Sequence, residues 1–473
     1  MNSTTMPPSA ASKKPGLLIN RDFALLWSGR SISLIGDYAF DTTLVLWIAV
    51  IIAKGQSWAP LAVSGVLLAT SIPMFVVGPI AGVFVDRWNK RRTMLWMDAA
   101  RAVLIALLLA ANLVPLPFLP GGRLSPAEQI AMIYATVFLA SICAQFFNPS
   151  RFALIGDLVP EEYRARASGL TQIAMSIAGI IGPPVAAPLL LVFGVQWALL
   201  INALSFVVSF LAILAIRAPR SASSVKEGQP TSFFKEFAEG IRFFLGNRVL
   251  VTLLVTVLIV MLGGGAINAL GVFFVIGSLH TPAQLFGLFD ASMGIGVIAG
   301  AILASVFAQR LGVARTFWVS TVLAGALILV ISRLSSFAPA LVFIALVGIF
   351  QAGLNVAVGP LLLHVTPREL VGRVSSVIDP MSSLASIVSV GLAGLLASTV
   401  LQHLDATLLG LHFGPIDTIF TGTGVLVVLG GLYAMVNLRG VTLAGEKKPA
   451  TAPAETPAPT VEDSNISAVS VSE

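Results

Sequence analysis

The chain has 473 residues, of which 56% are hydrophobic and 11% charged, and its mean hydropathy is +0.93. Soluble domains carry about a quarter charged residues, so a chain of this composition lacks the polar surface that a water-soluble protein needs. The formal net charge of +6 fits membrane topology and attraction to anionic lipid, and gives no indication of nucleic-acid binding. We therefore expect a polytopic membrane protein.

Twelve apolar segments are long enough to span a bilayer, which takes about 20 helical residues. No alternating strand pattern of a membrane barrel occurs, so we expect an all-α membrane protein. The expected spans are 23–53, 61–85, 93–114, 128–150, 167–193, 196–216, 247–276, 284–309, 314–333, 338–364, 372–400 and 416–437. The first 20 residues lack the apolar core of a signal peptide, so the first span is expected to be retained.

Positive charges favour one face of the membrane. With these spans, every lysine and arginine lies on the side of the N-terminus except Lys54, Arg123, Arg333 and the two within spans, Arg30 and Arg101. The positive-inside rule then places both termini in the cytoplasm, which predicts a multi-pass protein of the cell (inner, cytoplasmic) membrane.

The first span carries two acids four positions apart, Asp37 and Asp41, which therefore share one helix face. At 1.5 Å per residue from Trp27 at the interface, they lie roughly 15 Å and about 21 Å deep. Ionised carboxylates at that depth must face a polar cavity or be protonated. Both acids are candidate proton acceptors. The alternative is a pair of structural acids partnered by Arg30 or Arg101.

A run of charge separates the second and third spans. Residues 82–92 read GVFVDRWNKRR, which resembles the loop between helices 2 and 3 of the major facilitator superfamily, with its motif Gly-x-Leu-Ala-Asp-Arg-x-Gly-Arg-Lys. The chain departs from that motif at Phe84, Val85 and Asn89, and the last change is mild because asparagine tolerates the positive φ of a turn. The resemblance implies two six-helix halves in pseudo-twofold relation around a central cavity.

The resemblance also implies a gate at the cytoplasmic face. Asp86 is expected to brace the start of helix 11, near residues 372–376, because the free amides of a helix N-terminus stabilise an acid. Arg87 is expected to reach Asp157, which follows the fourth span. The gating candidates are Gly82, Asp86, Arg87, Arg91, Asp157 and Arg373. The alternative is a solvated loop that only sets the topology.

Two further spans contain recognisable patterns. Asp98 and Arg101 are three apart in the third span and are placed to pair, either as a coupling site or as a stabilising ion pair. Residues 178–187, AGIIGPPVAA, resemble a motif of facilitator antiporters in helix 5. Its core, Gly182 and Pro183, can kink the helix, and its small residues suit close packing. The arginine-bearing helix-4 motif of many proton-coupled exporters is missing.

The chain repeats itself at an offset of 207 residues. Residues 160–168, PEEYRARAS, correspond to residues 367–375, PRELVGRVS, with proline, arginine and serine in step. Parallel repeats of this kind build the two halves of some transporters. The expected regions are a cytoplasmic N-terminal segment (1–22), an N-terminal six-helix half (23–216), a cytoplasmic linker (217–246), a C-terminal six-helix half (247–438) and a disordered cytoplasmic tail (439–473).

The sequence contains no sign of cofactor chemistry. The four histidines lack zinc-ligand spacing, no Gly-Lys dipeptide of an ATP-binding loop occurs, and the single cysteine, Cys143, excludes an intrachain disulfide. We expect no metal, no cofactor and no enzymatic activity. No cluster of cavity arginines for a phosphate is recognisable. The cavity candidates are Gln172, Asn268, Gln351, Asn355 and Asp379, with Asp290 as a further acid.

Within the superfamily the chain resembles the bacterial drug:proton antiporter branch that includes macrolide-efflux and enterobactin-export proteins. The similarity lies in Gly36-Asp37, in the pair Asp98 and Arg101, and in the segment FNPSR over 147–151. It implies proton-driven export of a bulky amphipathic or lipophilic molecule by alternating access, which a cavity with few fixed charges suits. The expected partners are this small-molecule substrate, a coupling proton and membrane lipids, and we expect a monomer. The alternatives are a metabolite or sugar importer, or a non-transporting membrane sensor or scaffold.

Overall fold

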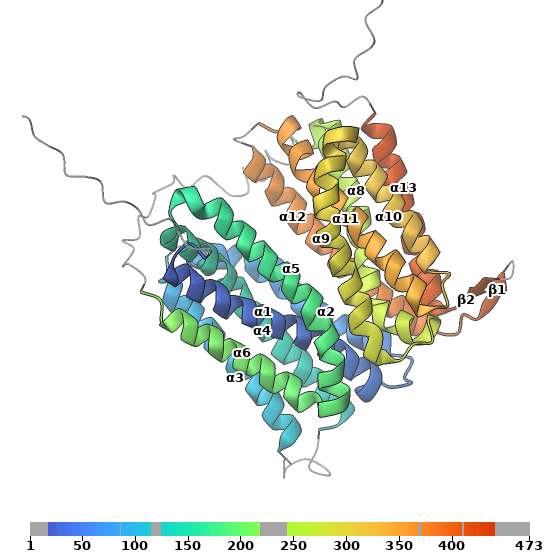
Figure 1. Cartoon of the computed structure of the whole chain (residues 1–473). Helices are drawn as coiled ribbons and strands as arrows, with labels where there is room; N and C mark the ends of the chain where they lie inside the picture. The colour runs from blue at the N-terminus through green and yellow to red at the C-terminus, as the bar shows by residue number, and fades with distance from the viewer. Residues whose placement is uncertain are drawn as a thin grey trace, which may run out of the picture.

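The computed structural model describes residues 18–85, 87–114, 124–217, 244–367, 370–408 and 411–439. Twelve helices in these ranges are long and apolar enough to cross a membrane, which confirms the predicted fold class. The first half contains α1 (Arg21–Leu46), α2 (Ala59–Val85), α3 (Lys90–Leu113), α4 (Pro126–Leu158), α5 (Arg164–Pro188) and α6 (Val195–Leu214). The second half contains α8 (Arg248–Phe273), α9 (Phe286–Leu311), α10 (Val313–Ile331), α11 (Phe337–Val365), α12 (Val371–Leu395) and α13 (Pro415–Asn437). Figure 1 shows the two halves as separate bundles side by side.

Short elements extend and connect these helices. Four long helices end in a π-helical turn: α1 in η1 (Trp47–Ile52), α5 in η4 (Leu189–Phe193), α8 in η5 (Phe274–Ser278) and α12 in η7 (Leu396–Val400). Two 3-10 turns, η3 (Glu161–Tyr163) and η6 (Ala283–Leu285), precede α5 and α9. Between α12 and α13 lies an antiparallel hairpin of β1 (Ala406–Leu408) and β2 (Leu411–Phe413), in which Thr407 is paired with His412. This hairpin lies beside the bundle and leaves the fold all-α in its spans.

The internal repeat is visible in the helix bounds. The offset of 207 residues that relates Pro160 to Pro367 also relates the start of α5 at Arg164 to the start of α12 at Val371. The same offset relates the two π-helical turns that follow these helices. The two halves therefore repeat a three-dimensional unit as well as a sequence pattern.

Polar contacts tie the first and last helices of each half together at one end of the molecule. Asp22 of α1 accepts a hydrogen bond from the backbone of Arg217, just after α6, and Arg248 of α8 donates to Asn437 of α13 at 3.1 Å. Asn20 caps α1 and donates to the Leu158 carbonyl at 2.8 Å. We call this end, to which both ends of each half return, the terminal end (Figure 1).

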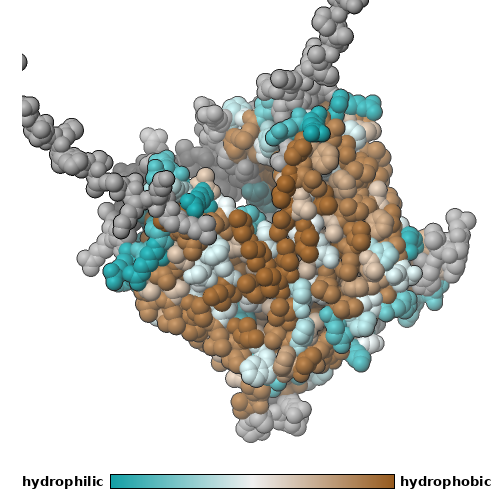
Figure 2. Space-filling view, in the orientation of Figure 1, coloured by the Kyte–Doolittle hydropathy of each residue, from teal (hydrophilic) through white to brown (hydrophobic). Residues whose placement is uncertain are grey.

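The two halves touch at the opposite end, here the far end. The Leu61 backbone at the start of α2 donates to the Ser398 hydroxyl after α12 at 3.0 Å, and Gly287 of α9 lies against Pro183 of α5. The largest hydrophobic cluster of the described residues contains residues from both halves, whereas the five smaller clusters each stay within one half. The molecule is thus closed at its far end, and Figure 2 shows a hollow between the halves toward the terminal end.

Closure at the far end depends on the missing side chain of Gly287. A Cβ there would come within 2.2 Å of the Pro183 carbonyl oxygen in the other half, and backbone atoms cannot yield as a flexible side chain does. We expect Gly287→Ala to loosen the far end, so that a cysteine placed at Ser398 in a Cys143→Ser background reacts faster with a membrane-impermeant maleimide. Gly359→Ala is the control, because a Cβ at Gly359 meets no described atom within 4 Å. Equal labelling in both variants would contradict this account of closure.

Two expectations about helix ends are wrong. α4 continues past residue 150 to Leu158, with Pro149 inside it, so Arg151 and Asp157 belong to the helix and not to the loop. Proline is tolerated within membrane helices when neighbouring groups satisfy the freed backbone. Asn89 has φ −71° and caps α3 by accepting from the Arg92 amide at 3.0 Å, so it acts as an N-cap and not as a positive-φ turn residue.

Candidate functional site

The charged loop between α2 and α3 is described only in part. Asp86 lies outside the described residues, so its contact with the start of α12 stays a prediction. Arg91 donates to the carbonyls of Ile213 at 3.1 Å and Leu214 at 2.7 Å, where a cation stabilises the C-terminus of α6. Lys90 forms an ion pair with Asp157 at 2.9 Å, and the expected contact of Arg87 with Asp157 stays a prediction.

The remaining loop candidates add little geometry. No atom of the described residues lies within 4 Å of a Cβ built on Gly82, so none of their contacts requires glycine there. Arg373 is in the first turn of α12, and its side chain lies outside the described part of the chain. Their gating roles stay predictions.

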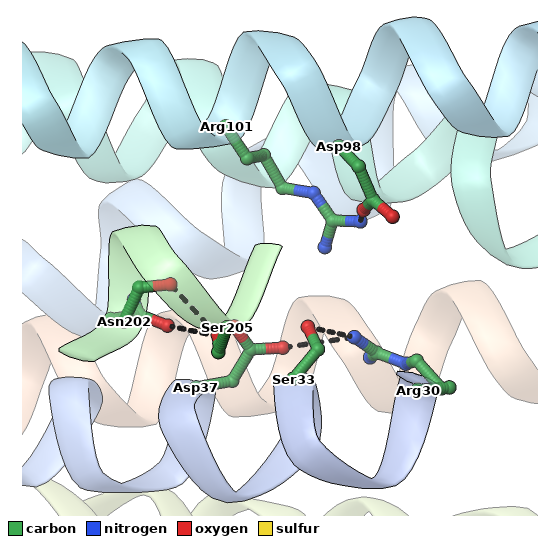
Figure 3. A network of polar contacts seen from close by, with 7 residues as sticks. All are labelled: Arg30, Ser33, Asp37, Asp98, Arg101, Asn202 and Ser205. Atoms are coloured by element: carbon green, nitrogen blue, oxygen red, sulfur yellow. Dashed lines mark hydrogen bonds and ion pairs between the residues drawn. The ribbon is translucent and has the colours of Figure 1, made fainter. Parts of the chain in front are cut away.

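The first acid of α1 is held by an arginine on the same helix. Arg30 donates to the Asp37 carboxylate at 3.1 Å and to the Ser33 hydroxyl at 3.2 Å. Figure 3 shows the three side chains along one face of α1, with Asn202 and Ser205 of α6 beside Asp37. The side chains of Arg30 and Asp37 are only 13% and 26% exposed. Arg30, of the two arginines considered, is therefore the partner of Asp37.

A second ion pair is sealed inside the first half. Arg101 donates to Asp98 at 2.5 Å on α3, and their side chains are 4% and 0% exposed. The Arg101 guanidinium lies over the rings of Phe147 at 4.6 Å and Phe206 at 4.5 Å, contacts that stabilise a desolvated cation. The pair thus links α3 to α4 and α6. Its enclosure favours the stabilising role over the coupling role.

The second acid of α1 has a different environment. Asp41 is exposed although every other residue from Ala39 to Ala49 is buried. Asp37 is the charged neighbour that acts on it, and no described cation pairs with it. The neighbouring Tyr38 lies within electrostatic reach of both Asp41 and Asp290 of α9. Asp41 is therefore an accessible, unpaired carboxylate near the place where the two halves meet.

The small residues of α5 bring these groups together. A Cβ at Gly182 would come within 2.5 Å of the Tyr38 Cβ and 3.0 Å of the Ala39 amide, so glycine is needed for the contact of α5 with α1. On the other side of α5, a Cβ at Gly294 of α9 would reach Ile180 at 3.3 Å. The motif in α5 thus serves close packing, and α5 runs as one helix through Pro183.

The second half contains an uncharged cavity of about 740 Å³, part of which is open to solvent. Residues from α8 to α13 line it, and no Asp, Glu, Lys, Arg or His is among them. Asn268 and Gln351, two of the expected cavity residues, belong to the lining. So do Met261, Met293 and Phe350, and methionine side chains adapt readily to ligands of irregular shape. An uncharged and mostly apolar lining of this kind suits an apolar ligand.

The other expected cavity residues lie elsewhere. Gln172, Asn355 and Asp379 are exposed on α5, α11 and α12 and are not part of this lining. Among the described residues, no three His, Cys, Asp or Glu side chains are grouped as a metal ion would require.

The structure reveals an arginine cluster that was not recognised in the sequence. Arg30 and Arg101 both lie over the ring of Phe147, at 5.5 Å and 4.6 Å, and Arg151 lines a pocket together with Arg30. These arginines lie inside the first half and are not part of the lining of the cavity in the second half. The fourth span was expected to end at residue 150, which placed Arg151 just outside it.

Comparison with known proteins agrees with this architecture. The family model described as Major Facilitator Superfamily matches residues 26–277 and 253–470. An uncharacterized MFS-type transporter, YkuC of Bacillus subtilis (strain 168), is 23% identical over 430 residues, which cover 89% of this chain and 93% of that protein. Macrolide efflux protein A of Streptococcus pyogenes is 26% identical over 385 residues, covering 80% of this chain and 90% of the relative.

A solved structure has the same fold. A bacterial homologue of the iron transporter ferroportin, in its inward-facing state, superposes with a TM-score of 0.66 at 17% identity, covering 88% of this chain and 98% of that one. A bacterial homologue of ferroportin in the outward-facing state superposes with a TM-score of 0.57, covering 88% of this chain and 99% of that one. From its fold, its repeat and the match to the family model over both halves, the chain belongs to the Major Facilitator Superfamily and is a membrane transporter.

Proposed function

We propose that the protein exports a bulky amphipathic or lipophilic compound by alternating access, driven by proton entry. The observation that carries this proposal is the division of the molecule into two chemically different halves. The second half offers an uncharged cavity of about 740 Å³, whereas the first half presents an accessible, unpaired carboxylate, Asp41, at membrane depth. An apolar cavity suits a lipophilic cargo, and an intramembrane acid suits a coupling proton.

Orientation follows from the distribution of charge. Lysine and arginine gather at the terminal end, so we place both termini in the cytoplasm. The hollow between the halves then opens inward. The higher TM-score against the inward-facing than against the outward-facing ferroportin homologue, 0.66 against 0.57, supports this assignment.

Coupling is assigned to Asp41 rather than to Asp37. Arg30 already neutralises Asp37 at 3.1 Å, so this carboxylate has little need of a proton. Asp41 has no such partner and its charged neighbour is another acid, so ionisation without a compensating cation is costly there. In the cycle, Asp41 takes a proton from the outer side and releases it inward. Cargo binding from the cytoplasm favours the release, and no ATP is consumed.

The relatives support export as the direction. The match to the relative named macrolide efflux protein A covers 80% of this chain, and that name states efflux of macrolides for that protein. For this chain we propose export of a bulky amphipathic or lipophilic compound, without specifying a macrolide.

Transport in vesicles tests the proposal. Inverted membrane vesicles that contain the protein are energised to make their interior acidic, and uptake of a panel of lipophilic fluorescent compounds is measured. We expect uptake that collapses when a protonophore removes the pH gradient. Accumulation in right-side-out vesicles with an acidic exterior would instead indicate an importer. Movement of no compound in either orientation would favour a sensor or scaffold.

A further inference from the structure

A second, smaller pocket lies inside the first half, at the terminal end of α1, α4 and α5. Its empty space, part of which is open to solvent, is about 260 Å³. Its polar lining residues are Arg30 and Ser31 of α1, Arg151 of α4 and Thr171 of α5, and its other lining residues are apolar, Trp27 among them. The pocket therefore combines two guanidinium groups with an apolar wall, and it lies apart from the cavity of the second half.

Arg151 has no counter-charge in the described structure. The residue is only 6% exposed, and its Nε has no hydrogen-bond partner among the described residues. Its guanidinium lies 4.8 Å from the ring of Phe152. The charged group that acts on it is Arg30, a second cation, whose own carboxylate partner is Asp37.

Charge counting within this part of the first half leaves one positive charge uncompensated. Asp37 forms an ion pair with Arg30, and Asp98 forms one with Arg101. Arg151 is the arginine without an acidic partner among the described residues. A buried, unpaired cation beside a like charge is costly. An anion between Arg30 and Arg151 would supply the missing counter-charge and reduce the repulsion between the two cations. Guanidinium groups bind carboxylates and phosphates through paired, charge-assisted hydrogen bonds.

We infer that this pocket binds the carboxylate or phosphate group of an amphipathic molecule, with Arg151 as its principal ligand. The apolar wall receives the hydrocarbon next to that group. One part of this inference rests on the proposed function and deepens it: the statement that an anionic amphiphile is the cargo. The binding site itself stands on the two arginines and their shared pocket.

Binding to the full-length protein in phosphatidylcholine nanodiscs tests the site, with radiolabelled decanoate as the probe. We expect saturable binding, competition by decyl phosphate, and competition by decanamide at least about tenfold weaker, because the neutral amide lacks the charge that a guanidinium prefers. Arg151→Gln should weaken decanoate binding by about tenfold or more, and Arg151→Lys by less. The control for lost charge is Arg310→Gln, at the exposed end of α9, which should bind as the wild type does.

A second variant keeps the test decisive if Arg151→Gln fails to fold. Thr171→Phe fills the pocket and keeps both arginines, and it should also abolish decanoate binding. Unchanged binding in Thr171→Phe or Arg151→Gln, equal competition by decanamide, or no saturable binding would overturn the inference. Nanodiscs with phosphatidylglycerol identify the source of the anion. Weaker decanoate binding there supports a lipid headgroup in the site, and unchanged binding supports a free anionic molecule.

Transport separates this inference from the proposed function. Suppose that Arg151→Gln still takes up a neutral lipophilic compound under a pH gradient, and that decanoate does not bind the wild type. This result overturns the anion site and leaves the proposed export standing. If decanoate binding depends on Arg151 but the protein transports no compound, the proposed export is overturned and the anion site stands.

Discussion

Asp41→Asn is expected to abolish transport driven by a pH gradient. The substitution keeps the size and hydrogen-bonding capacity of the side chain but removes the group that takes up and releases the proton, and no other described acid shares its exposed, unpaired position on α1. Proton-driven uptake in inverted vesicles should fall to the level seen with a protonophore. Exchange of labelled for unlabelled cargo at equal pH on both sides should persist, because it requires no net proton movement.

Two comparison variants make this result specific. Glu162→Gln removes an exposed acid from η3 and should leave proton-driven uptake unchanged. Asp37→Asn should reduce both uptake and exchange because it leaves Arg30 without its partner, and the double variant Arg30→Gln with Asp37→Asn should recover part of the loss. If Asp41→Asn retains full pH-driven uptake, Asp41 is not the coupling acid and Asp290 becomes the next acid to test.

Arg101→Gln is expected to destabilise the first half severely. It removes the partner of a carboxylate that is 0% exposed, and breaking a buried ion pair in this way costs about 3–5 kcal/mol. It also removes the cation that lies over Phe147 and Phe206. The measurement is the midpoint of thermal unfolding of the purified protein in detergent, together with the yield of folded protein. A midpoint within the scatter of the wild type would show that the pair does not hold α3, α4 and α6 together.

An apolar replacement of the whole pair distinguishes structure from coupling. Asp98→Leu with Arg101→Met leaves no uncompensated charge, and such exchanges of buried pairs are often neutral or stabilising. We expect the double variant to regain most of the lost stability and to keep proton-driven uptake. A stable double variant that has lost only the proton-driven component would instead assign coupling to Asp98.

The sequence contained enough information for the fold because membrane folds leave strong one-dimensional signals. The hydrocarbon core requires each span to be about 20 apolar residues long, and the repeat at 207 residues requires no knowledge of contacts. Pairs within one helix were also accessible. Asp98 and Arg101 lie three residues apart, and helical geometry alone places them on one face.

Only the tertiary structure shows which helices contact each other and which charged side chains are paired or buried. Asp37 and Asp41 look equivalent in the sequence, but the Arg30 guanidinium reaches one of them at 3.1 Å and not the other. Arg151 lies just beyond the expected end of the fourth span at residue 150, yet α4 continues to Leu158 and the arginine is buried. Helix periodicity depends on the local chain, and so the sequence determined which segments cross the membrane. Burial of these charges depends on helices that are distant in the sequence, as where Phe206 of α6 covers Arg101 of α3, and so the packing of the helices determined which charges are desolvated.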